Sequence, residues 1–573
     1  MIGIGGGATL DALRATGLGS IEVVELEAGV VEALPLLYRG REDPLADPRV
    51  RVRINDGRNE LLLARAEGRS WDVIASQPSH PWLMGAANLF TEEFFALVRD
   101  NLSEGGTFGA WINGTHTDTE SLLAIMTSFE RVFPGGLLLS AASTANPTKS
   151  LLLLGGRSPV VWDLARMRER LAEPALAAAL ALHDVRRVED LLARAEAPLA
   201  ALAALDPDAA NTDDNAFVET RLSRRFDWAD VDFGKIEERL PRNAPVLPPL
   251  RGELDAAALL DSVAAAAGPD GTPVYRRKLD RLLAQLGAAV EPILRETLDA
   301  ELTLRAGEPA DPAVSRLQSL ARHHPGRAEP LRALGRHWAR RGGDLAAAAA
   351  AFEEAWRRSG ESSDAYDAAR AWHSLDREAS WGWRDRIPPA ESDRFPRIAV
   401  YDAERALAQG ADRGALERHE RAVRAYRDTR EGRKYARIDR VLADLATALG
   451  RDREARAYAD ADRRRRAARA GELVRLAETA LGEGRLSDAQ GALDGAAGLL
   501  PGDFAVLRLQ VQLARARRDA PATAAALGEI QHWARTLERG VAAENRVRAE
   551  LGLPLRPPRP APTGLVAGQP PGG

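Results

Sequence analysis

Residues 1–9 read MIGIGGGAT, which predicts the end of a strand, a glycine-rich turn and the start of a helix. A second strand, IEVVEL at 21–26, carries an acid, Glu25, near its end. Gly5 and Glu25 lie 20 positions apart, which is the layout of a nucleoside-binding βαβ unit. The glycines let the backbone turn tightly beside a ligand, and the acid accepts hydrogen bonds from ribose hydroxyls. Only Met1–Ile4 remain of the first strand, whereas strands usually have about five or six residues.

The composition narrows the function classes. The chain has 573 residues, which predicts roughly two to four domains. Its net charge of -5, from 78 basic and 83 acidic residues, indicates neither a nucleic-acid partner nor an anionic membrane surface. Without cysteine it has no disulfide, thiolate zinc site or cysteine nucleophile. We see no signal-peptide pattern and no run of about 20 apolar residues, so we expect no transmembrane helix.

The first part of the chain alternates strands and helices. Further strands are expected at 50–54, 71–76 and 107–112, with helices at 9–16, 91–101 and 119–132. Such alternation predicts an α/β fold with a parallel, doubly wound sheet and right-handed crossovers. Two last strands, at 137–140 and 150–154, are expected to form an antiparallel hairpin at the edge of the sheet.

Composition changes divide the rest of the chain. We assign residues 1–157 to the α/β domain and 158–240 to a mainly helical extension that contains the polar cluster NTDDN at 211–215. The segment 241–252 is rich in proline and predicts a linker. Residues 253–552 are expected to be almost wholly helical, and the Pro- and Gly-rich tail 553–573 to be disordered.

Internal repeats appear in the helical part. The best copy has small and apolar residues at the spacings of a 34-residue tetratricopeptide repeat: Leu476, Ala477, Ala480, Gly484, Ala489, Leu493, Ala496 and Pro501. A second copy has Leu334, Gly335, Trp338, Gly342, Phe352 and Ala355, and a weaker third has Leu442, Ala443, Ala446, Gly450 and Ala455. Repeats of this type predict stacked helix pairs with a concave surface for a protein partner.

Several stretches resemble one known family, in the family's order. They are GIGGGAT at 3–9, VVELE at 23–27, DGR at 56–58, WDVIASQPSHPW at 71–82 and LFTEEFF at 89–95. They resemble the spermidine synthase family of polyamine aminopropyltransferases. More narrowly, they are similar to bacterial spermidine-synthase-like domains fused behind membrane transporter segments, in which NTDD, here at 211–214, is a recurrent end mark. The resemblance covers about residues 1–226 and implies a Rossmann-like fold of the S-adenosylmethionine-dependent transferase type.

The resemblance implies transfer of an aminopropyl group from decarboxylated S-adenosylmethionine to putrescine or another amine. The donor is a co-substrate, so no permanently bound cofactor and no metal are expected. Glu25 would hold the ribose and Asp56 the adenine amino group. The other residues implied to contact the donor are Gly3, Gly5, Gly6, Gly7 and Gly57.

The chain departs from the family pattern after the fourth strand, where two acids are usual. The first acid position is Gln77 and the second is His80. An amide has no useful basicity, so Gln77 cannot act as general base. His80 could, because its unperturbed pKa is about 6.5, but it stands where the family binds the diamine. Trp82, in the same loop, either walls the pocket or anchors the loop.

The family also has an N-terminal β-hairpin domain, which this sequence does not show. Either the gene model begins too late or the protein has lost this lid. We expect a cytoplasmic protein, tethered to a membrane if an upstream transporter segment is missing from this chain.

Two alternative functions stay open. One is a non-catalytic relic that binds an adenosyl ligand and acts as a scaffold through its helical repeats. The other is a small-molecule methyltransferase using S-adenosylmethionine itself, because the same sheet serves both donors. The basic run Arg463–Arg466 has acids beside it and predicts a solvated helix face, and His323–His324 have no second ligand pair at metal spacing.

Overall fold

The computed structural model describes residues 1–555, apart from 39–41, 79, 84, 141–149, 182, 184, 224–232, 267–271, 306–309, 341–342, 430–431, 433–434, 436, 502 and 537–539. The chain divides into two compact units. The first holds Met1–His337 and Ala346–Pro396, and the second holds Trp338–Leu345 and the residues from Arg397 onward.

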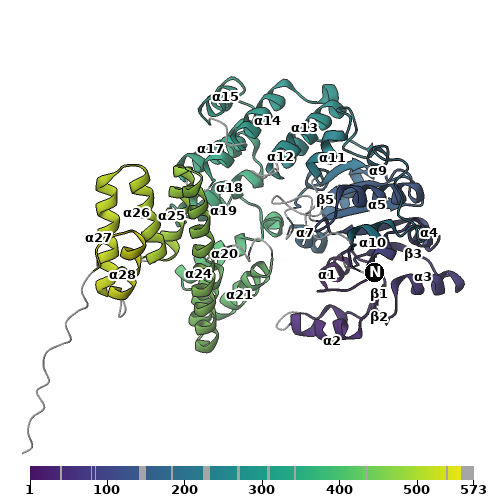
Figure 1. Cartoon of the computed structure of the whole chain (residues 1–573), viewed down its shortest axis with the longest axis horizontal. Helices are drawn as coiled ribbons and strands as arrows, with labels where there is room; N and C mark the ends of the chain where they lie inside the picture. Colours follow the sequence, from purple (N-terminus) through teal and green to yellow (C-terminus); the bar gives the residue numbers. More distant parts are fainter. Residues whose placement is uncertain are drawn as a thin grey trace, which may run out of the picture. The chain divides into compact units, whose positions relative to one another are not determined.

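The first unit contains a mixed sheet (Figure 1). Its strands are β1 (Ile21–Glu25), β2 (Val50–Ile54), β3 (Trp71–Ser76), β4 (Leu102–Ile112), β5 (Leu137–Ser140), β6 (Leu151–Gly156) and β8 (Ala195–Pro198). β1 pairs with β2, and the other strands follow in the order β3-β4-β6-β5-β8. The pairs β1–β2 and β3–β4 are parallel, whereas β6 is antiparallel to both of its neighbours and β8 is antiparallel to β5.

Ile2 joins these two groups of strands. It forms parallel bridges with Val24 of β1 and with Ser76 of β3, and its amide donates to the Ala75 carbonyl at 2.8 Å. The start of the chain therefore lies inside the sheet, with β1 and β2 on one side and β3 and β4 on the other. The strand order reverses here, and in open α/β sheets ligands bind at the carboxyl ends of the strands beside such a point.

Helices cover both faces of the sheet. Their buried side chains form two separate hydrophobic clusters, one for each group of helices. α3 (Gly57–Ala66), α4 (Glu92–Asp100) and α5 (Thr119–Val132) contribute to one cluster, which includes Ile2. α1 (Ala8–Arg14) and α2 (Ala28–Leu37) contribute to the other, which includes Ile4. Residues two apart in a strand face the same side, so this separation requires a local change of direction. Gly3 supplies it with a φ of 79°.

The larger cluster owes its stability to aromatic side chains from α4, β4 and α5. Fully buried phenylalanines stack or meet edge to face with ring centroids 4.9–6.4 Å apart. Burial of each such side chain contributes about 1.5–3 kcal/mol. They are Phe94, Phe95, Phe108, Phe129 and Phe133. This packing fixes β3 and β4, whose ends carry part of the site.

The last strands of the sheet correct two predictions. The predicted antiparallel pairing of 137–140 with the strand after it is confirmed as β5–β6. Its predicted position at the edge is wrong, because β6 lies between β4 and β5 and β8 pairs with the far side of β5. The predicted parallel sheet is likewise correct only as far as β4. β8 could not be predicted because AEAP is short, ends in proline and contains no β-branched or aromatic residue.

Short elements follow the sheet. They are β7 (Trp162–Asp163), α6 (Leu164–Leu171), α7 (Pro174–Ala181), α8 (Val188–Leu192), α9 (Leu199–Ala203), α10 (Phe217–Leu222), α11 (Phe233–Arg239) and β9 (Leu250–Arg251). In the predicted linker, Val246 and Leu247 are buried and both of their amides donate to Gln285 Oε1. β9 pairs with β7. This segment is thus packed against the helices that follow.

Helices form the rest of the first unit, apart from the ends of α16 and α17, which the division assigns to the second unit. They are α12 (Ala256–Ala266), α13 (Thr272–Leu286), α14 (Pro292–Arg305), α15 (Ala310–His323), α16 (Glu329–Trp338), α17 (Leu345–Ser359), α18 (Ser362–Trp372) and α19 (Arg377–Arg384). On α13, Lys278 pairs with Glu196 of β8 at 3.0 Å, and both are buried. Removing one partner would leave a buried charge, so this pair fixes α13 to the sheet.

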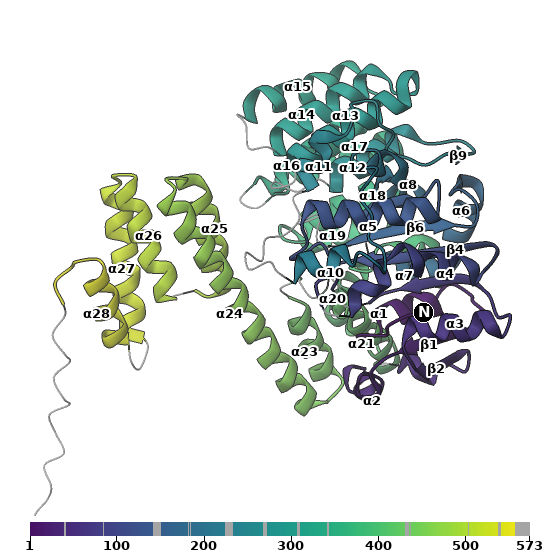
Figure 2. The same cartoon turned by 45° about the vertical axis from the view of Figure 1, so that its right-hand side comes forward.

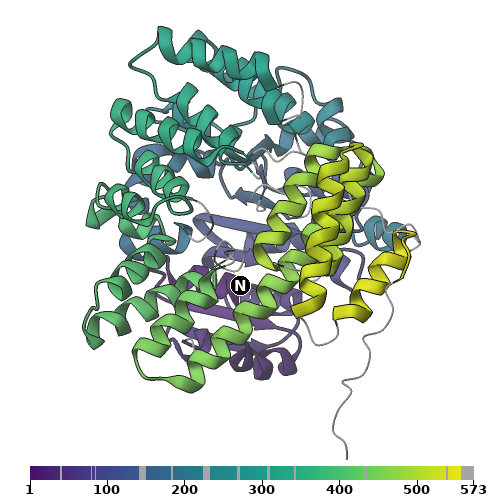
Figure 3. The same ribbon diagram turned by 90° about the vertical axis from the view of Figure 1, so that its left-hand side faces the viewer.

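The second unit is a series of helices. They are α20 (Ile398–Ala408), α21 (Arg413–Arg427), α23 (Ile438–Ala448), α24 (Asp452–Gly482), α25 (Leu486–Leu499), α26 (Phe504–Ala516), α27 (Ala520–Thr536) and α28 (Gly540–Glu550). Figure 2 shows the long α24 passing from α23 to α25, and Figure 3 shows α24 to α28 in light green and yellow. Residues 556–573, in the predicted disordered tail, lie outside the described residues.

Small residues stand where these helices cross. Ala477, Ala489 and Ala496 are fully buried between α24 and α25. In the first unit, a Cβ at Gly335 of α16 would lie 2.6 Å from the Phe352 ring of α17. Gly342 of the second predicted copy lies outside the described residues. The helix pairs are observed, and their assignment as tetratricopeptide repeats stays a prediction.

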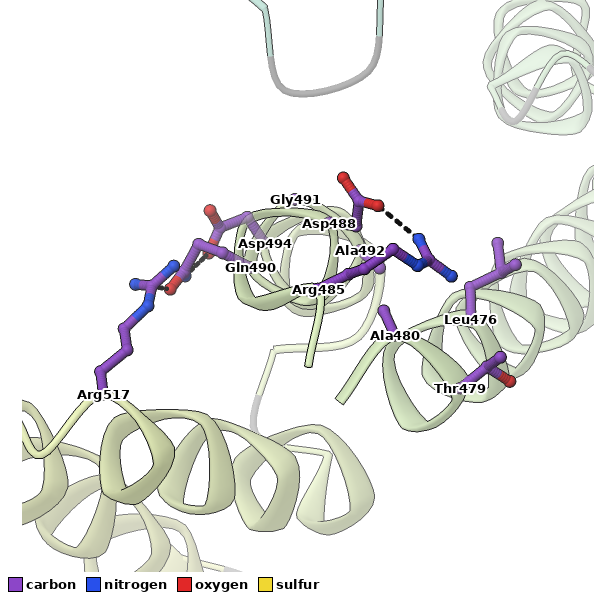
Figure 4. A pocket seen from close by; sticks show the side chains of 10 residues that line it. All are labelled: Leu476, Thr479, Ala480, Arg485, Asp488, Gln490, Gly491, Ala492, Asp494 and Arg517. Atoms are coloured by element: carbon purple, nitrogen blue, oxygen red, sulfur yellow. Dashed lines mark hydrogen bonds and ion pairs between the residues drawn. The ribbon is translucent and has the colours of Figure 1, made fainter. Parts of the chain in front are cut away.

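A cavity of about 460 Å³ opens between α24, α25 and α26 (Figure 4). Arg485 pairs with Asp488 on one side, and Arg517 donates to Gln490 Oε1 at 2.9 Å on the other. None of the helices in the described part of the chain has both the length and the apolar character that a membrane span requires.

Candidate functional site

At two positions of the glycine turn, neighbouring atoms leave no room for a side chain. A Cβ at Gly3 would lie 2.6 Å from the Gln77 carbonyl oxygen. Gly7, with a φ of 81°, is the N-cap of α1, and a Cβ there would lie 2.8 Å from the Tyr38 hydroxyl. Gly5 and Gly6 are exposed, and a Cβ added at either position would meet no atom within 4 Å. Gly3 and Gly7 thus shape the turn, and Gly5 and Gly6 form its open surface.

Glu25 is fixed beside this turn. Its Oε2 accepts from the Ile4 amide at 2.8 Å and its Oε1 accepts from the Glu27 amide at 3.1 Å. The residue is only 9% exposed. Each oxygen keeps a lone pair, because a carboxylate has about four acceptor positions. The Glu25 carboxylate is therefore held in one orientation, at the position that the sequence predicts to bind a ribose.

Asp56 and Gly57 lie at the end of the neighbouring strand, β2. Asp56 is exposed and caps α3, with Oδ1 accepting from the Asn59 amide at 2.9 Å. A Cβ at Gly57 would lie 2.5 Å from Ile2 Cγ2, so this glycine lets α3 pack on the first segment. The Asn55 amide donates to the Glu25 carbonyl at 3.0 Å, which sets the two acidic positions side by side on adjacent strands.

Two exposed apolar side chains flank Glu25 and Asp56, and no sequence motif predicted a role for them. Leu26 is 62% exposed and Ile54 is 52% exposed. Leu26 follows Glu25 directly, and Ile54 pairs with Glu25 in the sheet. The sequence could have indicated them, because both lie at strand ends beside residues predicted to bind the nucleoside. A large apolar side chain at such a position is expected to be covered by the protein or by a ligand.

Gln77 follows β3 and lies beside the same turn. Its backbone amide donates to the Ile2 carbonyl at 2.9 Å. Its side-chain Oε1 accepts from the Thr9 hydroxyl in the first turn of α1. The side chain is thus oriented by a contact 68 positions away in the sequence.

His80 is bound by Asn113, which follows β4. The Thr115 amide donates to Asn113 Oδ1 at 2.9 Å, and a backbone amide can only donate, so this atom is the oxygen. Asn113 Nδ2 therefore faces His80 Nε2, at 2.7 Å, and donates to it. A ring nitrogen that accepts carries no proton, so His80 is neutral with its proton on Nδ1.

The surroundings favour this neutral form. The pKa of His80 is lowered by burial and by the nearby His116. The Trp82 ring lies close to both histidines, with its centroid 5.1 Å from that of His80 and 5.9 Å from that of His116. Trp82 packs against the main core cluster. This end of the site therefore has an aromatic wall and an uncharged imidazole.

The NTDD cluster ties the extension to the domain. Asn211 is fully buried, donates to the Phe90 carbonyl at 3.0 Å and accepts from the Val218 amide at 3.0 Å. Asp213 pairs with Arg58, two positions after Asp56, and this pairing holds the pKa of Asp213 below its usual range. These contacts are structural, and they fix the start of α3.

The structure thus gathers the predicted residues at the carboxyl ends of β1, β2 and β3. The described residues include no group of three or more His, Cys, Asp or Glu side chains placed to hold a metal ion. Thr9 and Asn113 join the site through contacts that no local pattern shows.

The first part of the chain is similar in sequence to known proteins. Residues 1–147 match the family model of the spermine/spermidine synthase domain. A polyamine aminopropyltransferase of Synechococcus sp. (strain JA-2-3B'a(2-13)) is 34% identical over 139 residues, which cover 22% of this chain and 43% of that protein. One of Bacillus subtilis (strain 168) is 27% identical over 143 residues, covering 25% of this chain and 50% of that protein.

The chain thus spans half or less of the length of these relatives, and the match lies in the synthase-type domain, residues 1–147. A solved structure of spermidine synthase from Thermotoga maritima aligns with 28% of this chain and 53% of its own, at 23% identity and a TM-score of 0.23.

Proposed function

We propose that the synthase-type domain binds decarboxylated S-adenosylmethionine and transfers its aminopropyl group to an amine. The observation that carries this proposal is Glu25, whose carboxylate is held by the Ile4 and Glu27 amides beside the glycine turn. Relatives matching this region are named polyamine aminopropyltransferases, which supports the reaction class.

The nucleoside would occupy the carboxyl ends of β1 and β2. Glu25 would accept from the ribose hydroxyls and Asp56 from the adenine amino group. Asp56 Oδ2 makes no hydrogen bond within the described part of the chain, so it is available for that contact. Leu26 and Ile54 would cover the two apolar faces of the base, which explains why they stay exposed in the protein alone.

The transfer forms one bond and breaks another. The lone pair of an uncharged amine attacks the aminopropyl carbon, the carbon–sulfur bond breaks, and the sulfonium becomes a neutral thioether. The new ammonium then releases one proton. Gln77 cannot take it, and His80 Nε2 already accepts from Asn113. We therefore propose that the acceptor amine arrives deprotonated and releases the product proton to water.

The test is turnover. Full-length protein, donor and a panel of amines are incubated, and product is measured by mass spectrometry. The proposal expects methylthioadenosine and an aminopropylated amine in equal amounts, at a rate that rises with pH toward the pKa of the acceptor amine. Absence of both products with every amine, over that pH range, would contradict it.

A second candidate function is adenosyl-ligand binding without transfer, with a protein partner held by the helical part. The occupied Gln77 and His80 side chains favour it, and the cavity between α24 and α26 offers charged groups to a peptide. The two functions differ in one result: here methylthioadenosine binds, but no amine is modified.

A further inference from the structure

The side chain of Gln77 presents a hydrogen-bond donor where the family resemblance places an acid. Its Oε1 is occupied by the Thr9 hydroxyl. Its Nε2 donates to no group within the described residues. A carboxylate here would offer acceptors only, whereas this amide offers N–H groups.

His80 presents a donor as well. Its Nε2 accepts from Asn113, so the proton is on Nδ1, and in the described part of the chain Nδ1–H has no partner. The side chain is only half-buried, so this N–H is accessible. The groups that face His80 are Asn113 after β4, His116 in the next turn and Trp82 in its own loop. None of them is a carboxylate.

We propose that this acceptor end, made by Gln77, His80, Trp82 and Asn113, is an uncharged, donor-lined subsite that selects an amine carrying a hydroxyl or carboxylate oxygen in place of a second ammonium. The inference rests on the transfer function proposed above. An ammonium has three donors and no acceptor, so it gains nothing from two N–H groups. An oxygen can accept from either N–H, and the Trp82 ring beside His80 offers an apolar surface to the carbon chain.

A series of four-carbon amines tests this selection. Calorimetry is done on full-length protein saturated with methylthioadenosine, using putrescine, 1-aminobutane, 4-aminobutanol and 4-aminobutyrate. The compounds differ only in the end remote from the reacting amine. One or two hydrogen bonds predict that 4-aminobutanol or 4-aminobutyrate binds about tenfold more tightly than putrescine. Comparing 4-aminobutanol with 4-aminobutyrate shows whether the subsite recognises a hydroxyl or a carboxylate. Putrescine binding as tightly as both, or more tightly, would overturn the proposal.

Gln77→Glu is the matched variant, because it keeps the length of the side chain and an oxygen for the Thr9 hydroxyl. It replaces the donor by a carboxylate, so the order should reverse in favour of putrescine. Gln77→Met removes one of the two donors without adding charge, so it should weaken the preference while the His80 N–H remains. An unchanged order in Gln77→Glu would contradict the proposal.

The position of the proton on the His80 ring can be measured without any ligand. Nitrogen-15 NMR of the imidazoles should show a protonated Nδ1 and a bare Nε2 in the native protein. Asn113→Asp should move the proton to Nε2 and raise the pKa of His80 above its ordinary value of about 6.5. A native His80 protonated on Nε2 would overturn the assignment. If methylthioadenosine fails to bind while the NMR result holds, the proposed function is wrong and the selection falls with it.

Discussion

The two ends of the site differ in how their polar groups are used. At the nucleoside end, Glu25 is held by two backbone amides and keeps free acceptor positions. At the end proposed to bind the amine, Gln77 Oε1 accepts from the Thr9 hydroxyl and His80 Nε2 accepts from Asn113. The groups that these two side chains leave available are therefore N–H donors. Under the proposed function, one end offers carboxylate acceptors to ribose hydroxyls, whereas the other has no carboxylate among Gln77, His80 and Asn113 to pair with an ammonium.

Both ends share the glycine turn, so the difference between them depends first on its shape. Gly3→Ala should have the largest effect, because its Cβ would meet the Gln77 carbonyl at a φ of 79°. We expect a loss of about 3 kcal/mol in the free energy of unfolding and no methylthioadenosine binding. Urea unfolding and calorimetry measure both.

Gly6→Ala is the matched control, since nothing lies within 4 Å of a Cβ there. It should unfold at nearly the urea concentration of the native protein. Equal stabilities of the Gly3→Ala and native proteins would show that the turn does not rely on this contact.

Glu25→Gln breaks the nucleoside end alone. The side-chain amide keeps one acceptor oxygen and places its NH2 toward either the Ile4 or the Glu27 amide, which also donates. We expect methylthioadenosine to bind about ten- to a hundredfold more weakly. Glu27→Gln, in the exposed turn beside it, should bind as the native protein does. A similar loss in both variants would point to net charge rather than to a specific carboxylate.

Leu26→Ser probes the base rather than the ribose. Its side chain is exposed in the protein alone, so stability should not change, while methylthioadenosine should bind about three- to tenfold more weakly. Leu62→Ser, at an exposed position on the outside of α3, serves as the control. Unchanged affinity in Leu26→Ser would remove the role proposed for this side chain.

The smallest effect concerns pH at the acceptor end. The pKa of His80 is lowered in the folded protein, so the unfolded chain binds more protons in that range. The stability that this group contributes is therefore present above about pH 6.5 and is lost as the pH falls through the folded pKa. Urea unfolding at several pH values should show a weaker loss in His80→Asn than in the native protein. Parallel curves would contradict this.

Part of this picture could be predicted from the sequence. The strands between Ile21 and Ile112 follow from apolar or alternating residues and turn residues, although β4 begins at Leu102 rather than at the predicted position 107. The spacing of Gly5 and Glu25 predicted a nucleoside site, and this stays a prediction. These signals are local, because a strand, a turn and a helix start within a few residues of each other.

The remainder depends on contacts between distant residues. His80 and Asn113 are 33 positions apart, and only the pairing of β3 with β4 brings their strand ends together. β8 has no strand-like pattern and exists because β5 offers a free edge. The predicted linker is packed because Gln285 binds its amides. In each case tertiary structure decides what the local sequence does not encode.

Calorimetric titration of the native protein and Glu25→Gln with methylthioadenosine tests the central claim most directly. The claim is that the nucleoside end is a formed binding site that depends on the fixed Glu25 carboxylate. It predicts saturable binding with one ligand per chain in the native protein and affinity reduced at least about tenfold in Glu25→Gln. No binding to the native protein, or equal affinity in the two proteins, would contradict it.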